Sequence, residues 1–266
     1  MGEPLRGSRN YQRVQPVTSA TCGNLLLRSL GPQAFDWLRP HLQPVPLNQG
    51  HVIVGQGEPI TFVCFPEAGV TSVADVLPDG SRVEVALVGR DGMTNSQLLL
   101  GCEQASHEAL VQIGGGRSLR VEADVFGEFC ARHPSANRLF LRFIHALSIQ
   151  TARTLASNLR DPAAKRLSRW LLMCHDRIDG DEIQLLHEHI GRMLGVRRAT
   201  VTDTLHVLEG HGALRSKRGR ITVRDRPLLE ELAGASYGFA ETHYCRLIAP
   251  FGKAHPAQAA LFPTAG

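Results

Sequence analysis

Residues 186–209, LHEHIGRMLGVRRATVTDTLHVLE, constrain the fold more than any other stretch of the chain. Apolar residues recur at three- and four-residue steps on both sides of Gly195, which predicts two short amphipathic helices. Glycine takes a positive φ at little steric cost, so Gly195 suits a sharp turn between these helices. The predicted buried face comprises Ile190, Met193 and Leu194 of the first helix and Val201, Leu205 and Leu208 of the second, which runs from about Arg197 to Glu209.

The segment that follows, ALRSKRGRITVRD at 213–225, alternates apolar and polar residues around Arg218-Gly219. This pattern predicts a β-hairpin with a basic tip. Two helices joined by a short glycine-containing turn describe a helix-turn-helix, and a hairpin directly after it is a wing. The ordered set of helix, glycine turn, basic helix and basic hairpin is a far more specific signal than any one of its parts.

Charge is concentrated in the same region. Residues 192–226 contain nine Arg or Lys and three acids, a net charge of +6, whereas the whole chain carries +4. A basic patch on an otherwise balanced protein indicates a polyanionic partner.

We therefore expect the second helix to enter the major groove of duplex DNA with its N-terminus first. Arg198 can donate two parallel hydrogen bonds to guanine O6 and N7, and Thr200 and Thr202 can contact a phosphate or a thymine methyl. The basic side chains of the hairpin suit phosphates, which give affinity without sequence information. The candidate DNA-binding residues are Arg197, Arg198, Thr200, Thr202, Asp203, His206, Lys217, Arg218 and Arg220.

Between residues 44 and about 125, short runs rich in Val, Ile and Phe alternate with Gly, Pro or Asp turns. Asp79-Gly80, between SVADV and RVEVALV, is a strong hairpin signal because glycine accepts positive φ. Short strands at such close spacing predict a compact antiparallel β-barrel or sandwich. A helix is expected before them, at 23–40, interrupted by Gly31-Pro32.

Apolar residues recur at the three- and four-residue spacing of a helix in NRLFLRFIHALSIQTARTLASNLR, residues 137–160. One apolar stripe runs along this helix, with polar Thr151 at one of its positions. The stripe either packs on the helix's own β-domain or forms a helix–helix dimer seam, and its length favours the seam. The predicted dimer interface is Phe140, Phe143, Ile144, Leu147, Thr151 and Leu155.

Several classes of protein are not supported. No run approaches the roughly 20 apolar residues of a membrane span, and the N-terminus lacks the apolar segment of a secretory signal. The six cysteines form no CxxC pair, and His187 and His189 face different sides of a helix, so no metal site is expected. Nucleophile–base pairs, HExxH, a Walker loop and a dinucleotide fingerprint are also missing, so the protein is not expected to be an enzyme.

The order of elements resembles the Crp–Fnr family of bacterial transcription regulators, which join a cyclic-nucleotide-binding-like β-roll, a long dimerisation helix and a winged helix. IGRMLGVRRATVTDTLHVLE matches the family's helix-turn-helix closely, and VGRDGMTNSQLLLG and VQIGGGRSLRVEADVF resemble one subgroup. The resemblance covers residues 23–233. It implies an α+β fold with a jelly-roll sensor domain (23–132), a dimerisation helix (133–160) and a winged helix-turn-helix domain (161–234). The composition of residues 1–22 suggests a flexible tail, and residues 235–266 form an extension in which FAETHYCRLI can form one more short helix.

Two departures from the family concern ligands. Members that bind cyclic AMP hold its phosphate with a segment of FGE…RxA type, but the corresponding GMTNSQLLLGCEQASHEALVQI has no Arg. A buried phosphate without a cation would be costly, so cyclic AMP is not expected. The oxygen-sensing branch holds an iron–sulfur cluster on clustered N-terminal cysteines, whereas only Cys22 lies near this N-terminus, so no cluster is expected. The effector, if one exists, is unknown.

A third departure concerns the target. Where the cyclic AMP receptor has Arg, Glu and Arg as base readers, this chain has Arg198, Ala199 and Asp203, so its operator should differ.

The leading hypothesis is a homodimeric, cytoplasmic regulator that binds a pseudo-palindromic operator, with RNA polymerase as a further partner implied by the resemblance. The alternative is a small-molecule-binding or protein-interaction module whose winged helix does not read DNA. The basic hairpin favours DNA. The sequence does not name the operator, the regulated genes or the direction of regulation.

Overall fold

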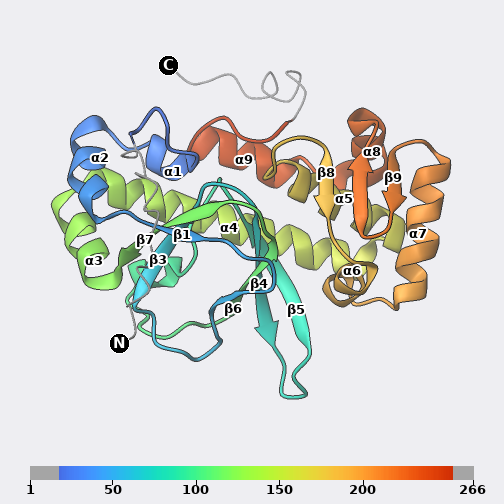
Figure 1. The fold of residues 1–266 in the computed structure, drawn as a ribbon, viewed down its shortest axis with the longest axis horizontal. Helices are drawn as coiled ribbons and strands as arrows, with labels where there is room; N and C mark the ends of the chain where they lie inside the picture. The colour runs from blue at the N-terminus through green and yellow to red at the C-terminus, as the bar shows by residue number, and fades with distance from the viewer. Residues whose placement is uncertain (1–17, 254–266) are drawn as a thin grey trace, which may run out of the picture.

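The computed structural model describes residues 18–253 and has an α+β fold (Figure 1). A β-roll and a winged helix lie side by side, and one long helix, α4, runs across both. The predicted N-terminal tail lies outside the described residues up to residue 17, as does the predicted C-terminal extension from residue 254 onward. None of the helices between residues 18 and 253 is long and apolar enough to cross a membrane.

The β-roll consists of two antiparallel sheets, as its short alternating runs predict. The first has the order β1-β7-β3 and the second β2-β6-β4-β5. The predicted hairpin at Asp79-Gly80 is present, because β4 pairs with β5 and Gly80 has φ +79°. The strands are β1 (Gln43–Pro46), β2 (Val52–Val54), β3 (Phe62–Pro66), β4 (Val70–Val76), β5 (Arg82–Val88), β6 (Glu108–Ile113) and β7 (Arg117–Glu122).

Short helices precede, interrupt and follow the strands of the roll. The predicted break at Gly31-Pro32 is confirmed, because Pro32 occupies the first turn of a second short helix. The helices are α1 (Leu25–Arg28), α2 (Pro32–Leu38), η1 (Arg39–His41), η2 (Ser96–Leu100) and α3 (Ala123–Arg132).

Helix α4 (Pro134–Arg160) is the predicted long helix, but its apolar stripe does not have a single role. Phe140 and Phe143 are 0% and 2% exposed and pack in the core of the roll, so these two residues do not face a partner subunit. Ile144, Leu147 and Thr151 are partly buried, and Leu155 is 61% exposed. The apolar stripe in the sequence does not distinguish residues that face the chain's own core from residues that face solvent. A 27-residue helix meets different neighbours along its length.

The winged-helix domain begins with α5 (Ala163–His175). Asp161, just before this helix, does not cap it, because its carboxylate accepts a hydrogen bond from the Ser236 hydroxyl (2.5 Å). The domain's core also takes in Val70, Leu87 and Ile113 of the roll, so the two domains share buried surface. Its other elements are β8 (Glu182–Gln184), α6 (His187–Leu194), α7 (Arg198–Gly210), β9 (Leu214–Lys217), β10 (Arg220–Val223), α8 (Arg226–Ala233) and η3 (Gly234–Ser236).

The chain then returns to the roll. The extra helix expected within FAETHYCRLI is α9 (Phe239–Leu247), which lies along α4 (Figure 1). Tyr244 of α9 and Phe251 beyond it are buried in the same core as the roll. The residues after the winged helix therefore complete the N-terminal domain.

Candidate nucleic-acid interface

The turn between α6 and α7 depends on two glycines. Gly195 ends α6 in the left-handed region (φ +60°, ψ +36°), as the sequence predicted. Gly191, one turn earlier, is needed for a different reason. A Cβ at this position would lie 2.9 Å from the Val196 carbonyl oxygen, which is too close for any side chain. These two positions set the crossing of the two helices.

Helix α7 presents its polar face to solvent. Val201, Leu205 and Leu208 are buried, as predicted, so the opposite side of the helix faces outward. Arg197 lies at the N-cap with no side-chain cap bond, which leaves the helix's first backbone N–H groups free of a side-chain acceptor. The outward residues are Arg197, Arg198, Asp203 and His206, which are exposed, and Thr200 and Thr202, which are partly exposed.

His187 connects the three parts of the motif, a role that sequence reasoning missed. Its Nδ1 lies 3.2 Å from the Thr202 hydroxyl of α7, and its Nε2 lies 3.4 Å from the Ser216 hydroxyl of β9. The Thr202 hydroxyl donates to the Arg198 carbonyl, which leaves it to accept from Nδ1–H. Burial, then nearby Arg198 and His206, lower the pKa of His187. The neutral ring thus holds the recognition helix against the wing.

The wing is a two-residue hairpin. Arg218 and Gly219 both have positive φ (+45° and +77°), the conformation of the turns that best match strand twist. Lys217, Arg218 and Arg220 are exposed around this tip. Arg220 makes a loose ion pair with Glu182, at 3.7 Å. The hairpin therefore presents exposed cations around a tip that lies beside Leu185 and Leu186, the residues that precede α6.

A separate surface follows the outer face of α4. Leu155 and Leu159 are 61% and 76% exposed, and Leu141 is also exposed. Exposed positions on this helix recur at alternating steps of three and four residues, the spacing of a coiled-coil seam. These positions are Leu141, His145, Ser148, Ala152, Leu155 and Leu159.

The roll offers no free cation to a cyclic phosphate around Gly92, among the residues that the structure describes. The large buried apolar cluster lies between the β1-β7-β3 sheet and the helices that cover it, and a Cβ on Gly92 would lie 2.4 Å from the Phe143 ring of α4. No Lys or Arg occurs between Arg90 and Arg117. The arginines around this segment are engaged in ion pairs: Arg82 with Glu108, Arg90 with Asp179, Arg117 with Glu67 and Arg120 with Glu122.

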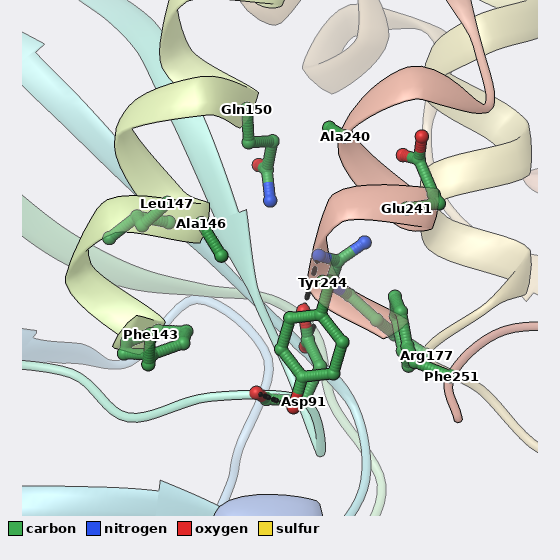
Figure 2. Close-up of a pocket in the computed structure, with 10 residues that line it drawn as sticks. All are labelled: Asp91, Phe143, Ala146, Leu147, Gln150, Arg177, Ala240, Glu241, Tyr244 and Phe251. Atoms are coloured by element: carbon green, nitrogen blue, oxygen red, sulfur yellow. Dashed lines mark hydrogen bonds and ion pairs between the residues drawn. The ribbon is translucent and has the colours of Figure 1, made fainter. Parts of the chain in front are cut away.

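Polar groups are instead buried where the two domains meet. The Arg177 side chain, at the end of α5, bonds the Asp91 carboxylate through two nitrogens at 2.6 and 3.0 Å. Figure 2 shows this pair between α4 and α9, with Tyr244 beside it. The Tyr244 hydroxyl donates to the Asp91 carbonyl (2.5 Å), and the guanidinium lies over the Phe251 ring at 5.2 Å. The roll, the winged helix and α9 thus meet at one buried cluster.

Together, the roll, the long helix and the winged helix define a two-domain DNA-binding regulator. Comparison with known proteins agrees. The family model for the Crp-like helix-turn-helix domain matches residues 165–232. A CRP-like cAMP-activated global transcriptional regulator of Mycobacterium tuberculosis is 22% identical over 217 residues, which cover 78% of this chain and 96% of the relative. The cyclic AMP receptor protein of Thermus thermophilus is 25% identical and is matched over 79% and 97%, respectively.

Solved structures show the same fold. FixK2 from Bradyrhizobium japonicum superimposes with a TM-score of 0.59 at 19% identity, covering 73% of this chain and 98% of that protein. A CRP-family transcriptional regulator from Thermus thermophilus gives a TM-score of 0.56 at 18% identity, covering 73% and 97%. Residues 165–232 match the Crp-like helix-turn-helix family, and the chain as a whole is similar in sequence and fold to regulators of the Crp–Fnr family, as the sequence resemblance indicated.

Proposed function

We propose that the protein is a homodimeric regulator that binds a pseudo-palindromic operator through α7 and the wing, without cyclic AMP. Because it would bind chromosomal DNA, we place it in the cytoplasm. RNA polymerase is the partner through which it would change transcription. The observation that supports DNA reading is that every candidate side chain, from Arg197 to Arg220, lies on the outer side of α7 and the hairpin. None of them is used to build the fold's core.

Base reading and phosphate binding can be separated by experiment. Arg198→Ala should weaken binding of the selected operator by about 1–3 kcal/mol and relax preference at one base pair. Lys217→Ala should weaken all sequences about equally and reduce the salt dependence of binding. Selection of bound fragments from random DNA measures both effects. If Arg198→Ala leaves the selected sequence unchanged, Arg198 does not read a base.

The same selection tests the alternative, a winged helix that contacts protein. Binding of duplex DNA that falls steeply with salt supports the regulator, because phosphate contacts release counterions. A chain that retains no duplex at low salt would favour the protein-interaction module instead.

We place the dimer seam on the outer face of α4. Leu141, Leu155 and Leu159 are the exposed apolar side chains of this face, and two copies would bury them against each other. The partly buried Ile144, Leu147 and Thr151 flank the seam. In a dimer, the two α7 helices would meet successive major grooves about 34 Å apart.

Leu155→Asp tests this seam, because it places a charge where two apolar side chains would meet. It should convert dimers to monomers by analytical ultracentrifugation and abolish binding of a two-half-site operator. Ala156→Asp is the matched control, since residue 156 is exposed on the same turn but off the seam. Dimers that persist in Leu155→Asp would place the interface elsewhere.

Independence from cyclic AMP is supported by the segment from Gly92 to Gly116, which holds no Lys or Arg, and by the ion pairs that engage the arginines around it in the described part of the chain. Adding cyclic AMP should leave both the melting temperature and the operator affinity unchanged. A rise in either one would show that the roll opens to accept the nucleotide.

A further inference from the structure

A cavity of about 270 Å³ lies between the β2-β6-β4-β5 sheet and α6, the first helix of the helix-turn-helix. It is on the side of the sheet that packs against the winged helix. Its volume is just below the usual range for small-molecule sites, so its occupant would be smaller than a drug-sized ligand. Polar side chains of both domains line this interdomain cavity, among them Ser72, Arg82, Glu84, Gln112, His189 and Arg192.

Gln112 of β6 supplies a free hydrogen-bonding group on the sheet side of the cavity. Its backbone carbonyl accepts a hydrogen bond from the Gln49 amide at 3.0 Å, but its own side-chain amide makes no hydrogen bond within residues 18–253. The residue is 6% exposed, yet neither amide atom is sealed from solvent, so the amide opens into the cavity that it lines. A largely buried amide without partners is costly, so it marks a place where a polar group of a ligand can bind.

Arg192 supplies a cation on the α6 side of the cavity. Its Nη2 lies 3.7 Å from a carboxylate oxygen of Glu188 on the same helix, which is a loose ion pair, and its guanidinium donates no hydrogen bond within the described part of the chain. The Arg82 guanidinium, by contrast, bonds the Glu108 carboxylate through both Nε and Nη2, with 3.0 Å between Nη2 and Oε2. Arg192 is therefore the guanidinium that can take a new acceptor.

The other ionisable groups in the lining leave this positive charge in place. Burial, followed by the nearby Arg192, lowers the pKa of His189, so its ring is neutral at pH 7. Glu84 offers a ligand no free oxygen, because its Oε1 accepts from the Trp170 indole N–H at 2.8 Å and its Oε2 is sealed from solvent. A single positive charge, on Arg192, is thus available to a ligand.

We propose that this interdomain cavity binds a small hydroxy acid that carries one carboxylate, with the carboxylate on Arg192 and the hydroxyl on the Gln112 amide. One negative charge matches the one available guanidinium, whereas a phosphate group would carry about two. The apolar side chains of Val52, Leu110 and Met193 in the lining would contact the ligand's carbon chain. The roll supplies the neutral polar group, and the helix-turn-helix supplies the cation.

This inference rests on the proposed function for its consequence. A ligand that bonds both the sheet and α6 binds most tightly when the two domains have the present arrangement, so it shifts the balance toward that arrangement. The operator affinity should therefore change when the cavity is filled.

Calorimetric titration of the full chain, without DNA, tests the site. The probes are two hydroxy acids of different size, lactate and mandelate, with their amides, which lack the charge, and with propionate and phenylacetate, which lack the hydroxyl. We expect at least one hydroxy acid to bind at millimolar or lower concentration. Its amide should not bind in that range, and the matching acid without the hydroxyl should bind more weakly, because the charge and the hydroxyl each make a contact.

Two variants assign these contacts to residues. Arg192→Gln should weaken binding of the hydroxy acid more than about tenfold, because it removes the cation. Arg132→Gln is the matched control, since Arg132 forms the same kind of ion pair one turn apart, with Glu128 of α3, but does not line the cavity. Gln112→Leu keeps a side chain of similar size without the amide, so it should weaken the hydroxy acid and leave the acid without the hydroxyl unchanged. A cooperative thermal transition checks that this variant folds.

Glu188→Gln provides a test with the opposite sign. The exposed Glu188 carboxylate competes with the ligand for Arg192, so removing its charge should strengthen binding by about two- to fivefold. The proposal is overturned if neither hydroxy acid binds, if an amide binds as tightly as its acid, or if binding survives unchanged in Arg192→Gln or in folded Gln112→Leu. Because the titration contains no DNA, failure of the regulator assignment would appear separately, in the operator assay.

Discussion

The core between the β1-β7-β3 sheet and its covering helices differs sharply from the interface between the roll and the winged helix. That core is apolar and rich in aromatic rings, with the Phe126 and Phe140 centroids 5.3 Å apart and both side chains fully buried. The interface between the domains buries ionisable groups instead: Asp91, Arg177 and Glu84 are all at most 6% exposed. An apolar core holds one shape over a wide range of conditions, whereas paired charges respond to protons and ligands.

The largest effect should come from breaking the Arg177–Asp91 ion pair between the roll and the winged helix. Arg177→Met leaves the Asp91 carboxylate buried without its partner, and should cost about 3–5 kcal/mol of unfolding free energy. Adding Asp91→Asn should restore part of that stability, because the unpaired charge is then removed. Urea denaturation of the two variants measures the difference. A double variant no more stable than Arg177→Met would show that the pair is not the source of the loss.

Glu84, buried between the roll and the winged helix, should make the stability of the folded chain depend on pH. Burial raises the pKa of this carboxyl from 4.5 to about 7, although Ser72 and Trp170 partly oppose the shift. The folded chain therefore holds a proton that the unfolded chain releases, so stability falls as pH rises from about 4.5 to about 7 and then levels off. The loss should be roughly 3 kcal/mol. Glu84→Gln should flatten that part of the stability profile, and an unchanged slope would assign the effect to another group.

A smaller effect is expected from the link between α9 and the roll. Tyr244→Phe removes the hydroxyl that donates to the Asp91 carbonyl but keeps the buried ring, so it should cost about 1 kcal/mol. Thermal unfolding of the full chain measures it. No change in melting temperature would mean that the ring alone attaches α9 here.

The smallest effect should arise inside the roll. Ser118 is fully buried, and its hydroxyl has no hydrogen-bond partner among the described residues. Ser118→Ala removes an unsatisfied polar group, so it should be neutral or slightly stabilising. A loss above about 1 kcal/mol would show that the β1-β7-β3 sheet also depends on buried polar contacts, which would weaken the contrast with the interface between the two domains.

The sequence predicted the winged helix well because its signals are local. The Gly195 turn, the buried stripe of α7 and the Arg218-Gly219 hairpin each depend on residues a few positions apart. The roll's hairpin at Asp79-Gly80 was predictable for the same reason. The role of α4 was only partly predictable, since a helical stripe does not show which of its residues face the chain's own core.

The buried contacts between the roll and the winged helix could not be predicted from the sequence. Trp170 and Glu84 are separated by 86 residues, as are Arg177 and Asp91, and Tyr244 is 153 residues from Asp91. In a single sequence, a buried acid such as Glu84 has the same appearance as a surface one. Its neighbours in β5 alternate as in any half-buried strand, and nothing local marks it as the lining of a cavity.

The return of α9 to the roll has a mechanical consequence. The winged helix leaves α4 near Asp161, and its far end is attached again to the same helix and to the roll through Tyr244 and Phe251. A domain held by one end can swing freely about that end. The winged helix is held at both of its ends, so a large rotation of this domain requires α9 to detach. The strength of that second attachment therefore limits how far α7 and the wing can move.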